Sequence, residues 1–220
     1  MAKAGPASKI QPAEGGGSPT TRRALIEAAV ETLKAEGFSG SSARSIAGRA
    51  GCNQGLVFYH FGSVVNLLLA ALDAVSAERL ERYSAAVDGV ESPAELVDAA
   101  ASIFEEDLDA GHVSVLVQMI AGASSTPGLG TAVAERIAPW TEFAQRSVDA
   151  AWGDSAMTSV IPPGDIAHAV VAMYVGLEML GHLDGDRGPA LALFEHARAL
   201  AALFSVPPAP DRPSGRSRTP

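Results

Sequence analysis

The sequence has little of what would define several other protein classes. Among its 220 residues there is one cysteine, Cys52, so an intrachain disulfide is excluded and a reducing compartment is favoured. There is no run of about 18 or more apolar residues, and the N-terminal segment lacks the apolar core of a signal peptide. We therefore expect a cytoplasmic protein without a membrane span.

Residue patterns that carry enzyme chemistry are also missing. No arrangement of Ser, His and Asp and no metal-ligand spacing stands out from the sequence. The segment GLGTAV at residues 128–133 resembles a phosphate-binding loop, but it lacks a third glycine and a preceding strand. We expect no catalytic activity, no cofactor and no metal, although an enzyme remains an alternative.

What the sequence does have is an uneven distribution of charge. The formal net charge is −9, yet residues 1–62 hold 7 Lys+Arg against 4 Asp+Glu, whereas residues 63–204 hold 6 against 20. A positive segment can approach phosphates while the acidic remainder is held away from them. Arginine (13) outnumbers lysine (3), which by association indicates a GC-rich bacterial genome.

Residues 42–61 read as two short helices joined by a tight turn. Ser42 can cap the first helix, which turns Ile46 to an apolar face. Gly51 follows the last periodic residue, where a left-handed backbone favours glycine, and Asn53 can cap the second helix. This arrangement is typical of a helix-turn-helix motif.

The second of these helices has two different faces. Val57 and Phe61 are four residues apart and share an apolar face, with Phe58 at its edge. The opposite face carries Gly55, Leu56, Tyr59 and His60. A polar and aromatic face of this kind suits entry into the major groove of DNA, and the alternative is a helical hairpin inside an ordinary bundle.

The segment from Thr20 to Leu72 resembles the DNA-binding domain of TetR-type transcriptional regulators. The matching stretches are TRRALIEAAVETLKAEGF, SIAGRAG and YHFGS. The resemblance implies an all-α fold of about nine helices, with a three-helix DNA-binding domain followed by a helical bundle for ligand binding and dimerisation. It also implies a repressor that binds a palindromic DNA operator as a homodimer and is released by a small-molecule effector.

Four regions follow from this interpretation. We expect a disordered N-terminal arm at residues 1–19, a DNA-binding domain at 20–80, a ligand-binding and dimerisation domain at 81–204, and a disordered proline-rich tail at 205–220. Within them, helical periodicity and helix-end signals predict helices over residues 20–36, 63–86, 92–110, 112–123, 129–152, 165–183 and 189–204, besides the two of the motif.

The resemblance assigns DNA contacts residue by residue. They are Arg22, Arg23, Ser42, Arg44, Asn53, Gln54, Gly55, Leu56, Phe58, Tyr59, His60 and Ser63. Three positions depart from the family pattern. Phe58 lacks the hydroxyl of the usual tyrosine, Leu56 replaces a small hydroxyl residue and would contact a thymine methyl, and Val64 removes a lysine that would contact phosphate.

The last two predicted helices are apolar around most of their circumference, so each must bury two sides. A second copy of the chain would cover the outer side in a two-fold interface. The residues expected there are Ala172, Gly176, Leu180, Phe194, Ala197 and Ala201. A deeply buried hairpin in a monomer is the alternative.

The resemblance also implies an effector site between the helices of the acidic body. The candidate lining residues are Phe104, Gln118, Met119, Trp140, Phe143, Met173, Tyr174 and Glu178. Tyr174 and Glu178 stand out, because a hydroxyl and a carboxylate in apolar surroundings need partners. The acidic run EEDLD at residues 105–109 is expected to be a solvated face rather than a site for a cationic ligand. The sequence leaves the effector unnamed, and a helical small-molecule-binding dimer without specific DNA binding remains an alternative function.

Overall fold

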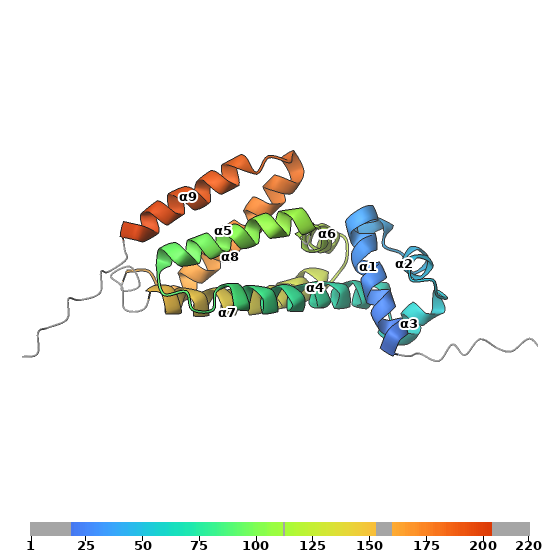
Figure 1. The fold of residues 1–220 in the computed structure, drawn as a ribbon. Helices are drawn as coiled ribbons and strands as arrows, with labels where there is room; N and C mark the ends of the chain where they lie inside the picture. Colours follow the sequence, from blue (N-terminus) through green and yellow to red (C-terminus); the bar gives the residue numbers. More distant parts are fainter. Residues whose placement is uncertain (1–18, 112, 153–159, 204–220) are drawn as a thin grey trace, which may run out of the picture. The chain divides into compact units, whose positions relative to one another are not determined.

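The regular structure of the computed structural model is entirely helical over the residues that it describes, 19–111, 113–152 and 160–203 (Figure 1). The helices are α1 (Pro19–Gly40), α2 (Ala43–Arg49), α3 (Gly55–Phe61), α4 (Val64–Ala86), α5 (Pro93–Ala110), α6 (Val113–Ala123), α7 (Leu129–Trp152), α8 (Pro163–Asp184) and α9 (Gly188–Leu203). The all-α prediction is confirmed. The predicted arm, apart from Pro19, and the predicted tail lie outside the described residues.

The chain divides into two compact units, Met1–Ala71 and Leu72–Pro220, and the division falls within α4. The predicted domain boundary at residue 80 lies later in the same helix. Contact density alone does not define where a function begins, so the functional limits of the two domains stay a prediction.

The N-terminal unit has a small apolar core. Leu25, Leu33, Ile46 and Val57 are each fully buried, and they come from α1, α2 and α3. Helix α1 extends past its predicted end at residue 36 across a kink at Gly37, whose φ of 72° is in the left-handed region that favours glycine. The short helices α2 and α3 are held in place by this core rather than by their length, since seven-residue helices are marginal alone.

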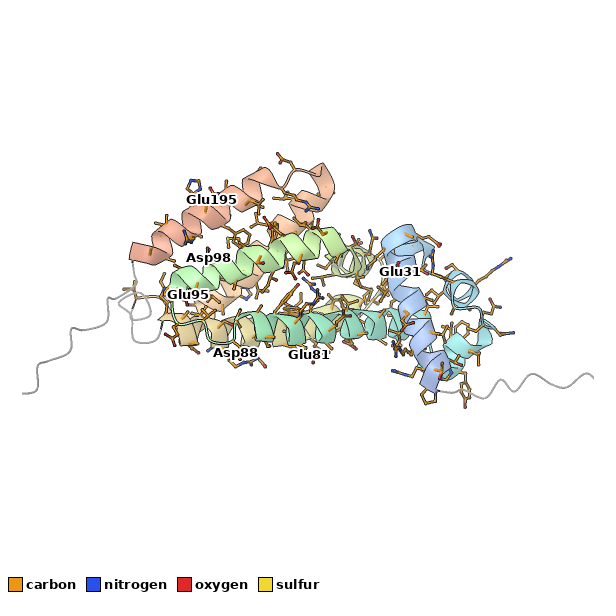
Figure 2. The ribbon with its side chains drawn as sticks, in the orientation of Figure 1. Glu31, Glu81, Asp88, Glu95, Asp98 and Glu195 are labelled. Carbon is orange, nitrogen blue, oxygen red and sulfur yellow. The ribbon has the colours of Figure 1, made fainter. Side chains whose placement is uncertain are left out.

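The C-terminal unit is a bundle in which α7 packs against α8 and α5 packs against α9. In Figure 1, α5 lies between α9 and the layer formed by α4 and α7. One buried cluster joins Phe104 of α5 to Ala190 and Phe194 of α9. Several acidic side chains of this unit point outward, as the labelled Glu81, Glu95 and Glu195 show in Figure 2.

No single helix in the described ranges is both long and apolar enough to cross a membrane. The pair α3 and α4 meets the length and composition criterion only when both are counted together across a bend of 66°.

Candidate functional site

The start of α2 is fixed by reciprocal hydrogen bonds between two serines. Ser42 Oγ accepts from the backbone N–H of Ser45 at 3.1 Å, and Ser45 Oγ accepts from the backbone N–H of Ser42 at 2.9 Å. Each side chain thereby accepts from the backbone N–H of the other residue, which is a capping box. At the other end of the helix, Gly51 has a φ of 66°. Both local predictions, the Ser42 cap and the left-handed Gly51, are confirmed.

The start of α3 is capped from two residues upstream. Asn53 Oδ1 accepts from the backbone N–H of Gly55 at 2.7 Å, as the sequence predicted for Asn53. A Cβ added to Gly55 would lie 3.1 Å from that same Oδ1 atom. Glycine at this position therefore leaves space for the Asn53 cap. It also lets another surface approach this side of the helix closely.

Helix α3 exposes aromatic side chains. Tyr59 is 73% exposed and Phe58 is 52% exposed, whereas Val57 is fully buried. The prediction that Phe58 lies at the edge of the apolar face underestimated its exposure, because Val57 and Phe61 already fill the inner face of so short a helix. His60, expected on the outer face, is instead half-buried, and its Nε2 has no hydrogen-bond partner within the described chain.

The N-terminal unit also carries exposed cationic side chains. Arg22 is exposed, and its guanidinium carbon lies 5.0 Å from the centre of the Phe61 ring. Arg23 pairs with Glu27 at 2.7 Å. Arg44 is exposed on α2. An exposed cation that packs against α3, as Arg22 does, suits contact with a phosphate backbone flanking a groove.

Three predicted DNA-contact positions remain, Gln54, Leu56 and Ser63. Gln54 is exposed and Leu56 is half-buried. Ser63 Oγ accepts from the backbone N–H of Asn66 at 3.1 Å, so this hydroxyl caps the start of α4 and keeps its proton to donate. Which of these residues touch DNA stays a prediction.

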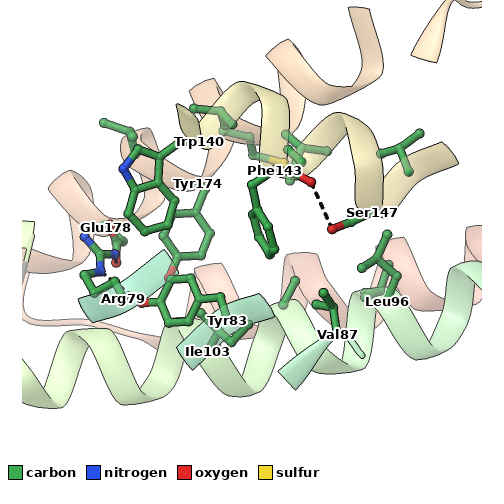
Figure 3. A pocket seen from close by; sticks show the side chains of 18 of the residues that line it. Arg79, Tyr83, Val87, Leu96, Ile103, Trp140, Phe143, Ser147, Tyr174 and Glu178 are labelled. Atoms are coloured by element: carbon green, nitrogen blue, oxygen red, sulfur yellow. Dashed lines mark hydrogen bonds and ion pairs between the residues drawn. The ribbon is translucent and has the colours of Figure 1, made fainter. Parts of the chain in front are cut away.

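The C-terminal unit contains a large cavity of about 610 Å³. Its walls come from α4, α5, α6, α7, α8 and α9, and most of the lining is aliphatic or aromatic. A volume in this range suits a drug-sized molecule. In Figure 3 the cavity has two ends: Arg79, Trp140 and Glu178 lie at one, and Val87, Leu96 and Ser147 at the other.

A buried charged cluster forms the polar end of this cavity. Arg79 of α4 donates to Tyr83 Oη at 3.0 Å and forms a close ion pair with Asp107 of α5. Tyr174 of α8 donates its hydroxyl to Asp107 Oδ2 at 2.7 Å. Glu178 Oε1 lies 3.6 Å from Arg79 Nη2, within ion-pair distance but too far for a hydrogen bond.

Burial and the neighbouring positive charge shift the pKa values of the two carboxyl groups in opposite directions. Burial raises the pKa of Glu178 to about 8, although the neighbouring Arg79 pulls it down. Burial also favours the neutral form of Asp107, but Arg79 and the hydroxyls of Tyr83 and Tyr174 bring its pKa below the ordinary value. At neutral pH the cluster therefore holds one carboxylate, one guanidinium and a mostly protonated Glu178.

Aromatic rings surround the same end of the cavity. The guanidinium carbon of Arg79 lies 5.0 Å from the centre of the Trp140 ring and 5.5 Å from that of Tyr83. The Tyr174 ring packs edge-on against Phe104, with ring centres 5.7 Å apart.

The Trp152 indole Nε1 is buried without a hydrogen-bond partner within the described chain, and its side chain lines the cavity.

The structure brings most of the predicted effector residues to this cavity. Those that line it are Trp140, Phe143, Met173, Tyr174 and Glu178. Phe104 and Met119 are fully buried in the packing and Gln118 is half-buried, and none of the three is among the lining residues.

Sequence reasoning missed the centre of the cluster, which is Arg79 with Asp107. A signal was present, because Arg79 and Tyr83 continue the inward spacing of Leu72 and Val75 along α4. The prediction that the acidic run at 105–109 is solvated was wrong for Asp107, whose side chain is fully buried. A cation in an apolar stripe predicts a buried carboxylate partner, and only the fold identifies which one.

The predicted interface residues are divided between two environments. Ala172 and Leu180 of α8 are exposed, Leu180 to 57%. A Cβ added to Gly176 would meet nothing within 4 Å. Phe194 and Ala201 are instead buried and line the cavity, as does the half-buried Ala197, because α9 turns this side toward α5. The exposed side of α8 is therefore accessible to a second copy, whereas Phe194, Ala197 and Ala201 of α9 face the interior of their own chain.

Metal ligands do not gather anywhere in the part of the chain that the structure describes. Nowhere in it do three or more His, Cys, Asp or Glu side chains come together in a way that could hold an ion.

Comparison with known proteins identifies the N-terminal unit. Residues 25–71 match the model of bacterial regulatory proteins of the tetR family. The chain is 33% identical over 110 residues to the HTH-type transcriptional regulator BetI 1 of Chromohalobacter salexigens, and this alignment covers 46% of the chain and 50% of that protein. The aligned part thus spans about half the length of this relative.

Solved structures extend the similarity to the whole fold. A TetR-family member from Streptomyces coelicolor A3 has a TM-score of 0.62 at 25% identity, covering 86% of this chain and all of the other. The multidrug binding protein EbrR in complex with imidazole has a TM-score of 0.62 at 22% identity, covering 89% and 100%. The two-unit helical architecture is therefore that of TetR-family proteins.

Proposed function

We propose that this chain, a TetR-family protein by its N-terminal domain and its fold, is a DNA-binding transcriptional repressor controlled by a small molecule. It binds an operator with inverted symmetry as a homodimer, and an effector in the cavity of the C-terminal unit releases it. The observation that carries the proposal is the family match at residues 25–71, which spans the helix that exposes Phe58 and Tyr59.

Recognition of the operator is assigned to α3. Its exposed Tyr59, with Gln54 and Leu56, would face base edges in the major groove. Arg22 and Arg44, both exposed, would contact phosphates and fix the register of the domain on the duplex. The hydroxyl of Ser63 is a further phosphate donor at the start of α4.

Dimerisation is assigned to the exposed side of α8. Leu180 offers apolar area there, while Ala172 and Gly176 leave space for another helix to approach. Two copies would then present two α3 helices to successive major grooves, which is why the operator should be an inverted repeat.

Effector control is assigned to the cavity. A ligand shifts the protein between DNA-binding and released states only by its different affinity for the two. The lining of the cavity comes from α4 to α9, so a bound molecule can favour one packing of these helices over another.

The test is binding of the purified full-length chain to DNA from upstream of its own gene, compared with unrelated DNA of equal length. Fluorescence anisotropy at several salt concentrations gives both the affinity and its salt dependence. The proposal expects saturable binding at least about a thousandfold tighter to one fragment. Equal, salt-sensitive binding to both would contradict it for that region.

A second candidate function rests on the departures from the family pattern. Phe58 and Val64 each remove an expected phosphate contact, which favours a helical small-molecule-binding dimer without specific DNA binding. That protein would bind ligand in the cavity and show only weak binding to any duplex. The DNA experiment above separates the two functions.

A further inference from the structure

We infer that the cavity of the C-terminal unit binds an organic cation with an extended apolar body, and that Glu178 is the carboxylate that pairs with its charged head. The inference deepens the effector role proposed above for the same cavity and rests on it for its regulatory meaning. Binding itself can be tested without DNA.

The first observation is the imbalance of partners around Arg79. Asp107 accepts from both Arg79 and Tyr174, and Arg79 also donates to Tyr83. Glu178 approaches Arg79 no closer than 3.6 Å, and its Oε1 has no hydrogen-bond partner within the described chain. The side chain is 2% exposed and lines the cavity. It is a buried carboxyl group that lacks a full counter-charge.

The second observation is the sign of the charge that would complete the cluster. Two carboxyl groups share one guanidinium, so an added cation balances an ionised Glu178. An added anion would meet two carboxyl groups and an arginine already engaged by Asp107 and Tyr83. A neutral alcohol could bond to Glu178 but would leave it protonated, which gives up the ion pair.

The third observation is the shape of the site. The charged cluster lies at one end, and the rest of the cavity is lined by apolar side chains such as Leu96, Val97 and Val170. The ring of Phe143 lies between these regions in the wall, and the ring of Trp140 lies at the charged end (Figure 3). Aromatic rings favour a weakly hydrated cation such as a quaternary ammonium. A charged head with an apolar chain or ring system matches both ends.

Binding of a cation is then coupled to loss of a proton. The groups that act on Glu178 are Arg79 from α4, Asp107 from α5 and Tyr174 one turn earlier on α8. Arg136 of α7 lines the same cavity but pairs with Asp73 at 2.7 Å, and the span of α6 carries no ionisable side chain. In the empty cavity Glu178 is mostly protonated at pH 7, so the incoming cation displaces its proton to solvent.

The experiment compares three probes with the same chain length: decyltrimethylammonium, decan-1-ol and decanoate. The two ionic probes are used below their micelle concentrations and the alcohol below its solubility limit. The ammonium probe keeps its charge at all pH values, so any pH dependence comes from the protein. Isothermal titration calorimetry of the full-length chain in two buffers with different ionisation enthalpies measures affinity and protons released together.

We expect the ammonium probe to bind at least tenfold tighter than the alcohol or the carboxylate at pH 8. Its affinity should rise roughly fiftyfold from pH 6 to pH 8 as Glu178 ionises, with about one proton released per probe at pH 7. Glu178→Gln should lower the affinity for the ammonium probe about tenfold or more at pH 8 and abolish the pH dependence. It should leave decan-1-ol binding unchanged.

The matched control is Glu142→Gln, on an exposed side chain of α7, which should behave as the parent protein. Tighter binding of decanoate, absence of ammonium binding, or an unchanged pH dependence in Glu178→Gln would overturn the inference. If Glu178→Gln does not fold, proton release by the parent protein decides: none would overturn it. Cation binding without operator binding would contradict the proposed repressor alone, and operator binding without cation binding would contradict this inference alone.

Discussion

The two units of this chain place their polar groups in opposite ways. In the N-terminal unit the side chains proposed to contact DNA are exposed: Tyr59 is 73% exposed, and Arg22 and Arg44 are exposed as well, over a small core of fully buried apolar residues. In the C-terminal unit Arg79, Asp107 and Glu178 are buried around a cavity. A surface that reads a large, hydrated polyanion must be exposed, whereas a site for a small molecule must be enclosed.

This difference makes the energetic consequences of substitution differ as well. An exposed ion pair contributes little to stability, because water screens it and two long side chains must be ordered. Removing one partner of a buried ion pair is costly, because the remaining charge is neither paired nor solvated. Substitutions in the buried cluster should therefore have the largest effects on stability, and those of exposed pairs the smallest.

Arg79→Met should produce the largest loss of stability. It leaves Asp107 buried with only hydroxyl partners and removes the one cation near Glu178, at a cost of about 3–5 kcal/mol in the free energy of unfolding. Urea unfolding of the full-length chain measures this. The further substitution Asp107→Asn should recover part of the lost stability. A loss below about 1 kcal/mol in Arg79→Met alone would show that the cluster is not tightly enclosed.

The pH dependence of stability should change with Glu178→Gln. Because the folded-state pKa of Glu178 is raised to about 8, the unfolded carboxyl ionises first as pH rises from about 4.5. The free energy of unfolding should therefore fall between about pH 5 and pH 8, by up to a few kcal/mol at about 1.4 kcal/mol per pKa unit. The variant should lack this decline. A parallel decline in both proteins would assign it to other groups.

Tyr59→Ala should abolish specific DNA binding while leaving the fold and the dimer intact. Loss of an exposed base-contacting side chain costs about 1–3 kcal/mol of binding free energy, or roughly fivefold to 150-fold in affinity. Fluorescence anisotropy with operator and unrelated duplexes measures it, and Tyr59→Phe distinguishes the ring from the hydroxyl. Unchanged operator affinity for Tyr59→Ala would remove this residue from the recognition surface.

Ser42→Ala should destabilise the N-terminal unit by about 1 kcal/mol, because the backbone N–H of Ser45 at the start of α2 loses its acceptor, Ser42 Oγ. Hydrogen exchange at the amides of α2 and α3 reports this unit separately from the other. Faster exchange confined to α2 and α3 is the expected pattern. Equal acceleration in α7 and α8 would mean that the two units unfold as one.

Arg198→Met gives the smallest expected effect and is the exposed counterpart of the first prediction. Arg198 of α9 pairs with Asp98 of α5 at 2.7 Å, and both side chains are more than half exposed. The change in the free energy of unfolding should lie between about 0 and 1 kcal/mol. A loss as large as that of Arg79→Met would break the contrast between exposed and buried pairs.

The sequence predicted the helical elements and the turn well, because these depend on local signals. Ser42, Gly51 and Asn53 act through backbone groups within a few residues, and the apolar spacing of α1 and α7 follows from a period of 3.6. The side chains of the cavity were predicted only in part. Glu178 and Tyr174 stood out as polar groups in apolar helices, and both line it.

What the sequence did not predict depends on packing between distant segments. Asp107 lies in an acidic run that looks solvated, and only the approach of α4 and α8 shows that one member of the run is buried. Phe194 looked available for a second copy, but α9 turns it toward Phe104. Burial of this kind is decided by tertiary contacts, which a helical period does not encode.

Selection of duplexes from a random DNA library by the full-length protein tests the proposed repressor without requiring a known operator. A homodimer that reads DNA through α3 should enrich an inverted repeat whose half-site centres are about 10–10.5 base pairs apart or a multiple of that spacing. Tyr59→Ala should lose this enrichment. A library that remains random after repeated selection, with the protein folded and dimeric, would contradict the proposed function.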